Sequence, residues 1–185
     1  IEIESAPKRY YPLGEQIAPL IGFAGRDGIG TDGLEKILNT QLSGISGSEI
    51  VLKNASRKPQ VVTPVVPGVA FYLTIDSRIQ FITFKHLSRF IEANNAKGGS
   101  AVVLDNHSGE ILAIASYPSY NPNNPFREIQ RNRALVDAVE PGSIIKPLAL
   151  AKGIDMGLIS LLDSVDTSPG FITLNRVKIS DPRNY

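Results

Sequence analysis

The stretch Val139-Glu140-Pro141-Gly142-Ser143-Ile144-Ile145-Lys146-Pro147-Leu148-Ala149 decides how the rest of the chain is interpreted. A Pro-Gly turn precedes Ser143, Lys146 follows three residues later, and an apolar run typical of a helix comes next. If a helix begins at Ser143, the two side chains share one face, about one turn apart. A hydroxyl and an amine held in this way form a nucleophile and a general base for acyl transfer.

The chemistry of this pair places demands on the local structure. Lys146 must be neutral to accept the proton of Ser143, and both the partial positive charge of a helix N-terminus and apolar neighbours such as Ile144 and Leu148 disfavour a charged amine. The Ser143 backbone N–H could supply half of an oxyanion hole. Pro147 is compatible with a helix that starts at or after Ser143, or whose first turn is distorted.

The S-x-x-K spacing is not specific by itself. Ser5-Ala6-Pro7-Lys8 has the same spacing, but its proline and polar surroundings predict a loop. The residues alone therefore leave a second interpretation of Ser143 open, in which it is a buried N-cap serine followed by a solvated Lys146. The context of the stretch has to decide between the two.

Composition excludes several classes of function. Among the 185 residues the net charge is +1, without the excess of basic residues that a dedicated nucleic-acid binder shows. The chain has no cysteine, and its two histidines, His86 and His107, are far apart in sequence, so we expect neither a His/Cys metal cluster nor another cofactor.

The two ends of the sequence indicate a piece of a longer protein. The chain begins at Ile1 without a signal-peptide pattern or a long apolar run, and it ends six residues after a hairpin predicted over 171–179, around Asn175-Arg176. Two strands alone are marginally stable, so we expect truncation of a larger domain.

The first part of the chain predicts little regular structure. Leucine and isoleucine spacing predicts a helix over roughly 32–43, ended by Gly44. The segment 28–33 matches the dinucleotide pattern G-x-G-x-x-G, but the preceding residues are turn-like and no βαβ unit surrounds it. A glycine-rich turn that leads into a helix is favoured over nucleotide binding.

Residues 53–68 are rich in proline and basic side chains, which predicts an extended linker and a domain boundary near Gly68. After it we expect a strand over 69–74, and then a long helix capped by Asp76 that runs to about Ala96. Apolar residues cover a broad arc of this helix and predict that it is well buried, with His86 in or at the edge of the core.

The second part of the chain predicts an α+β fold. Strands over 100–104 and 110–116 form a hairpin whose turn contains His107, and a loop over 117–125 follows. The serine helix runs from Ser143 to about Met156 and ends at Gly157. Strands and helices in this order indicate an antiparallel sheet with helices.

Several segments combine with the serine stretch into a family pattern. They are Arg9-Tyr10-Tyr11-Pro12 with Gly14, 20–23 with 28–36, 73–80, 98–116, 117–123, 131–134 and 140–147. With these motifs, spread over nearly the whole chain, the sequence resembles the class B penicillin-binding proteins, and most closely the septal, FtsI-type peptidoglycan D,D-transpeptidases.

The resemblance implies a function and a domain plan. Ser143 would be the acyl-enzyme nucleophile and Lys146 the general base, acting on peptidoglycan stem peptides that end in D-Ala-D-Ala and acylated by β-lactam antibiotics. Residues 1–68 would be the later part of a non-catalytic pedestal, and 69–185 the front of the transpeptidase domain, in a partial penicillin-binding fold.

The resemblance also implies a place in the cell. It predicts a bacterial inner-membrane protein with a single N-terminal anchor, absent from this sequence, and with residues 1–185 in the periplasm. Its expected partners are a septal glycosyltransferase and division proteins that bind the pedestal; no nucleic acid is expected.

The sequence departs from the family in one respect. The family site also needs S-x-N and K-[ST]-G after the nucleophile; the only S-x-N here, Ser119-Tyr120-Asn121, precedes it, and no K-[ST]-G occurs. We therefore expect the 185-residue chain alone neither to turn over peptide nor to bind β-lactams efficiently.

Two alternatives to a transpeptidase stay open. One is a class D β-lactamase or β-lactam-sensor-like S-x-x-K protein, and the other is a non-catalytic division scaffold.

Overall fold

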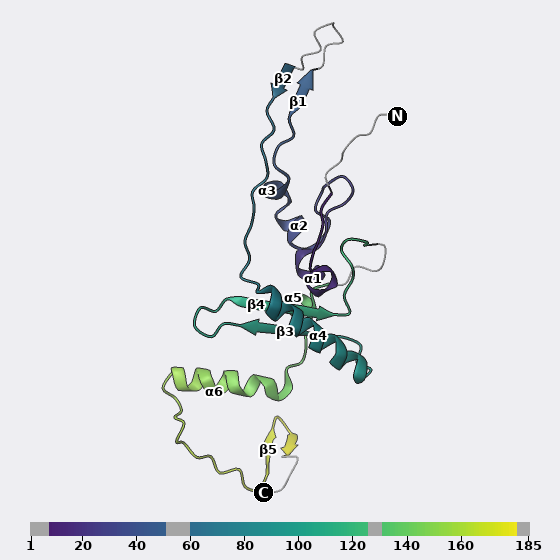
Figure 1. Cartoon of the computed structure of the whole chain (residues 1–185). Helices are drawn as coiled ribbons and strands as arrows, with labels where there is room; N and C mark the ends of the chain where they lie inside the picture. The colour runs from purple at the N-terminus through teal and green to yellow at the C-terminus, as the bar shows by residue number, and fades with distance from the viewer. Residues whose placement is uncertain (1–7, 51–59, 126–130, 181–185) are drawn as a thin grey trace. The chain divides into compact units, whose positions relative to one another are not determined.

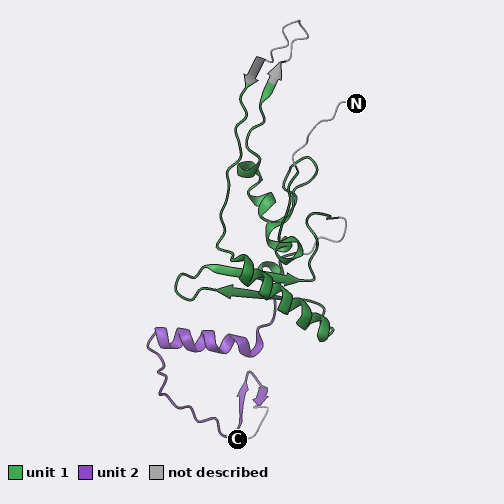
Figure 2. Cartoon of the chain, viewed as in Figure 1, with its two compact units in different colours: residues 1–137 green, residues 138–185 purple. Residues whose placement is uncertain are grey.

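The computed structural model describes residues 8–50, 60–125 and 131–180, which belong to two compact units (Figure 2). The first unit is Ile1–Asp137 and the second is Ala138–Tyr185. This division differs from the boundary expected near Gly68, which stays a prediction.

The first unit holds most of the regular elements (Figure 1). In chain order they are η1 (Gly14–Gln16), α1 (Ala18–Ile21), α2 (Gly33–Ile37), α3 (Asn39–Ser43), β1 (Ser48–Ile50), β2 (Gln60–Thr63), α4 (Ser77–Ala93), β3 (Gly99–Leu104), β4 (Ile111–Tyr117) and α5 (Arg133–Val136). The strands form two separate antiparallel pairs, β1 with β2 and β3 with β4. Helices with antiparallel sheets confirm the α+β class.

The predicted hairpin is present as β3 and β4. The pairs run from Gly99 opposite Tyr117 to Leu104 opposite Ile111, with an irregularity between Val103 and Leu104. The turn is closed by Asp105, whose carboxylate accepts hydrogen bonds from the N–H groups of His107 and Ser108 at 2.8 Å each. His107 is exposed in that turn, as expected.

Helix α4 begins as predicted. The Asp76 carboxylate accepts hydrogen bonds from the N–H groups of Arg78 and Ile79, at 2.8 and 3.2 Å, and so satisfies two of the donors that a helix N-terminus leaves without an intrahelical acceptor. The helix ends at Ala93, three residues before the expected end, because Asn95 adopts a left-handed φ of 50°.

The predicted burial of α4 was wrong. Only Gln80 and Ile91 are buried in the helix, whereas Ile82 and Phe90 are 54% and 66% exposed and His86 is exposed. The helix packs on β4 and β3, and strands lie only about 4.8 Å apart, so a two-stranded hairpin is too narrow to cover the whole apolar arc.

Gln80 connects three parts of the first unit. Its side chain is fully buried; its amide donates to the Gln16 carbonyl at 2.6 Å and to the Ile114 carbonyl at 3.1 Å, and its carbonyl accepts from the Ile114 N–H at 2.8 Å. A buried amide needs such partners because it loses water on folding. Helix α4, strand β4 and η1 are thereby held together.

Two other expectations were corrected. The helix expected over 32–43 is broken at Leu38, whose φ and ψ are −98° and 11°, and the carbonyl oxygen of the next side chain, Asn39, accepts from Gly30 N at 2.7 Å. Residues 69–74 form no strand in the described part of the chain. The Val69 N–H donates a hydrogen bond to the Gln41 carbonyl, but this bond is not part of a β-ladder.

The second unit contains η2 (Gly142–Ile144), α6 (Ile145–Asp155), β5 (Phe171–Leu174) and β6 (Val177–Ser180). Strands β5 and β6 form the predicted hairpin, and the two turn residues, Asn175 and Arg176, both have positive φ, as a tight hairpin turn requires. Helix α6 is followed by Gly157 at φ 67°, which confirms the predicted end. In the described residues of both units, no helix is long and apolar enough to cross a bilayer.

Candidate active site

Gly142 sets the direction in which the chain enters the serine segment. Pro141 is right-handed helical, with φ −72° and ψ −21°, and Gly142 then takes a left-handed φ of 55°. The Ile144 N–H donates to the Pro141 carbonyl at 3.2 Å and closes a tight turn around Ser143. A residue with a Cβ is disfavoured at such a φ, so glycine suits the position before the serine.

The serine and lysine of the predicted pair lie on consecutive turns. Ser143 is in η2, and Lys146 is the second residue of α6, with right-handed backbone at Ile144 and Ile145 between them. This arrangement agrees with a distorted first turn. Pro147 is the third residue of α6, where its missing N–H leaves no intrahelical acceptor unsatisfied.

The pair is open to solvent. Ser143 and Lys146 are exposed, and the apolar neighbours Ile144 and Leu148 are themselves 78% and 65% exposed. Within the described residues no hydrogen bond joins the Ser143 hydroxyl to the Lys146 amine. The second unit thus presents the predicted nucleophile and the predicted base at one helix end, without the apolar enclosure expected around the amine.

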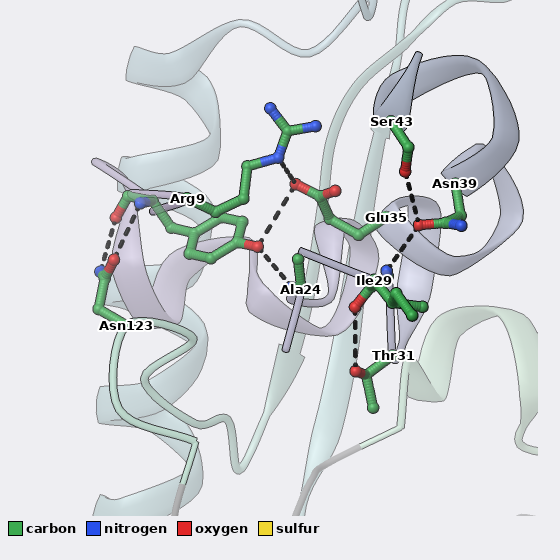
Figure 3. Close-up of polar contacts among 10 residues, drawn as sticks. Arg9, Ala24, Ile29, Thr31, Glu35, Asn39, Ser43 and Asn123 are labelled. Carbon is green, nitrogen blue, oxygen red and sulfur yellow. Dashed lines mark hydrogen bonds and ion pairs between the residues drawn. The ribbon is translucent and has the colours of Figure 1, made fainter. Parts of the chain in front are cut away.

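A polar cluster in the first unit contains the tyrosine of the R-x-Y-P motif (Figure 3). The Tyr11 hydroxyl accepts from Ala24 N–H at 2.7 Å and donates to the Glu35 carboxylate at 3.4 Å, and Arg9 pairs with the same carboxylate at 3.2 Å. Burial is the main cause that raises the pKa of Tyr11, so it stays a neutral donor near pH 7. The motif is structural here rather than catalytic.

The glycine run has a packing role. A Cβ on Gly22 would lie 1.8 Å from the Asp32 carbonyl oxygen, and one on Gly30 would lie 2.0 Å from the Glu35 carbonyl oxygen. The φ of Gly33, 57°, is left-handed as well. These glycines allow the backbone to cross itself closely, which supports the glycine-rich turn over nucleotide binding.

The loop over 117–125 is held by the N-terminal segment, which sequence reasoning missed. Asn123 and Tyr11 exchange two hydrogen bonds at 2.9 Å, and the Tyr120 hydroxyl donates to the Ala18 carbonyl at 3.2 Å. Tyr120 also packs edge-to-face on Phe23. Both ends of this contact lie in motifs recognised from the sequence, but no feature of either motif indicates their pairing.

The described residues contain no group of three or more His, Cys, Asp or Glu side chains that could hold a metal ion. On the N-terminal side of the serine segment, Arg131 and Arg133 each form an ion pair with Asp137. On its C-terminal side, Lys152 pairs with Asp155.

Comparison with known proteins identifies the chain. The "Penicillin-binding Protein dimerisation domain" family matches residues 1–73, and the "Penicillin binding protein transpeptidase domain" family matches residues 99–184. The chain belongs to the penicillin-binding proteins. Ser143 lies within the transpeptidase match, whereas Ser5, which is outside the described residues, lies within the dimerisation match.

Curated penicillin-binding relatives match most of the chain. The probable peptidoglycan D,D-transpeptidase PenA of Neisseria meningitidis is 41% identical over 177 residues, covering 90% of this chain and 30% of PenA. The peptidoglycan D,D-transpeptidase FtsI of Escherichia coli is 36% identical over 191 residues, covering 100% of this chain and 32% of FtsI. The chain spans about a third of the length of these relatives.

Solved penicillin-binding structures share the fold. Penicillin binding protein 3 of Mycobacterium tuberculosis superposes with a TM-score of 0.80 at 32% identity, covering 96% of this chain and 38% of that one. A peptidoglycan synthetase of Bifidobacterium adolescentis gives 0.78 at 29% identity, covering 95% of this chain and 33% of that one. The expected partial transpeptidase fold is therefore confirmed.

Proposed function

We propose that the protein carrying this chain is a peptidoglycan D,D-transpeptidase of septal cell-wall synthesis, with Ser143 as nucleophile and Lys146 as general base. The observation that supports the proposal is the turn at Gly142, after which Ser143 lies in η2, directly before α6, and Lys146 follows three residues later in α6. The names of the relatives PenA and FtsI supply the substrate class.

The proposed first step forms an acyl-enzyme. Ser143 Oγ attacks the carbonyl carbon of the penultimate D-Ala of a stem pentapeptide and transfers its proton to Lys146 Nζ. The C–N bond to the terminal D-Ala breaks, and the leaving amine takes up a proton from Lys146. The Ser143 N–H stabilises the oxyanion because it points from the start of a helix, where N–H groups have no intrahelical acceptor.

The second step transfers the acyl group. The amine of a neighbouring stem peptide attacks the ester carbon, the C–O bond to Ser143 breaks, and the serine oxygen regains a proton. β-Lactams acylate Ser143 in place of the stem peptide.

The proposal also includes a location and partners. The protein would be held at the inner membrane by a single anchor, with this region in the periplasm. Its partners would be a septal glycosyltransferase and division proteins that bind residues 1–68.

Covalent labelling of the full-length gene product tests this function. A fluorescent penicillin should label the wild-type protein at Ser143, Ser143→Ala should abolish labelling, and Lys146→Ala should reduce the labelling rate by at least 10²-fold, the lower end of what general acid–base catalysis contributes. Ser5→Ala, in the other S-x-x-K sequence, is the matched control and should label like wild type.

Product analysis separates the proposed activity from its alternatives. Incubation with stem pentapeptide and an acceptor amine should yield cross-linked product. Rapid hydrolysis of the labelled β-lactam would favour a β-lactamase instead. No labelling of a correctly folded wild-type protein would favour a non-catalytic scaffold and overturn the proposal.

A further inference from the structure

Strand β4 has an outer edge that is already occupied. On this edge the Ile114 N–H donates to the side-chain carbonyl of Gln80 at 2.8 Å, and the Ile114 carbonyl accepts from the Gln80 amide at 3.1 Å. Two residues earlier, the Leu112 carbonyl accepts from the Asp76 N–H at 2.9 Å. The start of α4 therefore makes the hydrogen bonds that a further strand would make, and the β3–β4 sheet is closed on this side.

Strand β3 has the opposite edge, and that edge is open. Val102 is the partner of Ile114 across the hairpin, and because Ile114 bonds outward to Gln80, Val102 also directs its N–H and carbonyl away from β4. Backbone groups alternate along an antiparallel strand, so the same holds for Ser100 and Leu104. In the described part of the chain this sheet has only two strands, and no strand pairs with the outer side of β3. These residues thus offer a row of donors and acceptors to another strand.

The sequence of β3 lacks the features that protect edge strands. Natural edges are shielded by lysine, proline or an inward charge, whereas residues 99–104 contain neither a charged side chain nor a proline. Gly99 faces α4, because an added Cβ would lie 2.8 Å from Ile91 Cδ1. Side chains alternate, so Val102 and Leu104 are on the other face, where they are 46% and 54% exposed. The open edge is therefore apolar as well as unpaired.

Helix α4 leaves an apolar groove beside the same strand. The groove is lined, among others, by Ile82, Leu87 and Phe90 of the helix, and by Ala101 of β3. Ile82 and Phe90 are 54% and 66% exposed, because the two-stranded hairpin is too narrow to cover them. A strand added next to β3 would widen the sheet beneath these side chains. The edge and the groove therefore fit one partner, which brings both a strand and an apolar surface.

We propose that β3 is an interaction surface for a second copy of this chain, and that the two β3 strands pair antiparallel about a two-fold axis. Val102 then lies opposite its own copy and Ser100 opposite Leu104 of the second copy, so every outward backbone group of the strand finds a partner. The result is a four-stranded sheet with both copies of α4 on one face. Strands are about 4.8 Å apart, so two helices that each lie over their own hairpin are about 10 Å apart, close to the distance between packed helices. The pairing does not depend on Ser143 being a nucleophile.

Cysteine cross-linking of the 185-residue chain tests the pairing, because the chain has no cysteine of its own. Val102→Cys should give a disulfide-linked dimer under mild oxidation, since hydrogen-bonded partners in antiparallel strands have Cα atoms about 5.5 Å apart, within the range of a disulfide. Ser100→Cys alone should not, because its own copy lies four residues, about 14 Å, further along the partner strand. A mixture of Ser100→Cys and Leu104→Cys should cross-link again. Equal cross-linking of Val102→Cys and Ser100→Cys would overturn the two-fold pairing.

Sedimentation equilibrium measures the association without a cross-link. The wild-type chain should form dimers, and Val102→Lys should raise their dissociation constant roughly tenfold or more, because it places two positive charges opposite each other. Val65→Lys, the same change at a 72% exposed valine outside the hairpin, is the matched control and should dimerise like wild type. A monomeric wild-type chain would overturn the proposal. Slow hydrogen exchange of the Val102 N–H in that monomer would identify another segment of the same chain as the occupant of the edge.

Discussion

Gly142 is the residue whose backbone most directly determines where Ser143 lies. Its φ of 55° is left-handed, and no atom lies within 4 Å of where a Cβ would be, so replacement by alanine meets conformational strain rather than a steric clash. Gly157, at the other end of α6, has a φ of 67° and equally open surroundings. The two glycines therefore have similar backbone conformations and surroundings, but Gly142 is next to Ser143 in sequence and Gly157 is far from it.

Alanine at Gly142 and at Gly157 should destabilise the protein to the same extent but differ in chemistry. Each change should lower the free energy of unfolding by about 1–2 kcal/mol, the cost of a left-handed residue with a Cβ. Only Gly142→Ala should also slow penicillin acylation, by roughly tenfold or more, because relief of the strain rotates the peptide that carries Ser143. Urea titration and stopped-flow labelling measure the two quantities. Equal acylation rates in both variants would show that this turn does not position the serine.

The helical placement of Ser143 and Lys146 was predictable from the sequence and their surroundings were not, while their catalytic roles stay a prediction. The spacing, the Pro-Gly turn and the apolar run are local features, and the structure places both side chains at the start of a helix. The enclosure expected from Ile144 and Leu148 is absent because burial depends on what packs against a helix, which spacing does not reveal. Asp137 was not anticipated, since a single aspartate carries no pattern that indicates two arginine partners.

The N-terminus of helix α4 is stabilised by the contacts of its N-cap residue, Asp76. The Asp76 carboxylate accepts from two backbone N–H groups and pairs with the Arg78 guanidinium at 3.0 Å. The Arg78 side chain, followed by the two backbone donors, lowers the pKa of Asp76 from 3.8 to about 2. A carboxyl whose folded pKa is depressed stabilises the fold fully above its unfolded pKa, and this contribution is lost as pH falls through the folded value.

Substitution of Asp76 should therefore have a pH-dependent effect. Asp76→Ala should lower the thermal midpoint at pH 7, and the difference from wild type should shrink between pH 3.8 and about 2. Asp76→Asn should keep the capping hydrogen bonds but lose the ion pair, so its midpoint should lie between the two. Differential scanning calorimetry at several pH values provides the comparison. A difference that stays constant down to pH 2 would exclude the carboxylate as its source.

Elements with local signals were predicted and elements that depend on distant partners were not. Asp76 and the turn from Asp105 to Gly109 specify their helix and hairpin within a few residues, and both were predicted correctly. The segment 69–74 has the composition of a strand but lacks a neighbouring ladder in the described chain. The helix expected over 32–43 is interrupted where Asn39 caps the N–H of Gly30, a contact across nine residues.

The first unit is tied together across long sequence separations. Tyr11 and Asn123 exchange two hydrogen bonds although 112 residues separate them, and Ser119 Oγ donates to the Glu15 carbonyl at 2.6 Å. The buried residues Tyr11, Ala18, Phe23 and Tyr120 form one core cluster. The N-terminal segment and the loop after β4 thus share one core, even though the two matching families divide the chain between them.

Removal of the Asn123 side chain should destabilise this core as a whole. Asn123→Ala deletes both hydrogen bonds to the Tyr11 backbone and should cost about 1–3 kcal/mol, because it leaves a partly buried N–H and carbonyl without their partner. The exposed turn residue Asn106 offers a control, and Asn106→Ala should change stability by less than about 0.5 kcal/mol. Urea unfolding followed by tyrosine fluorescence measures both. A change confined to a separate N-terminal transition would contradict one shared core.

The separation of Tyr11 from Asn123 also has a consequence during synthesis. Translation adds about 5–20 residues per second, so 112 residues take on the order of 6–22 s. For that time Tyr11, and with it Ala18 and Phe23, exists without the loop that completes its core. The newly made N-terminal segment therefore exposes this apolar surface to chaperones that bind unfolded nascent chains. Its packing is among the last events in the folding of this part of the protein.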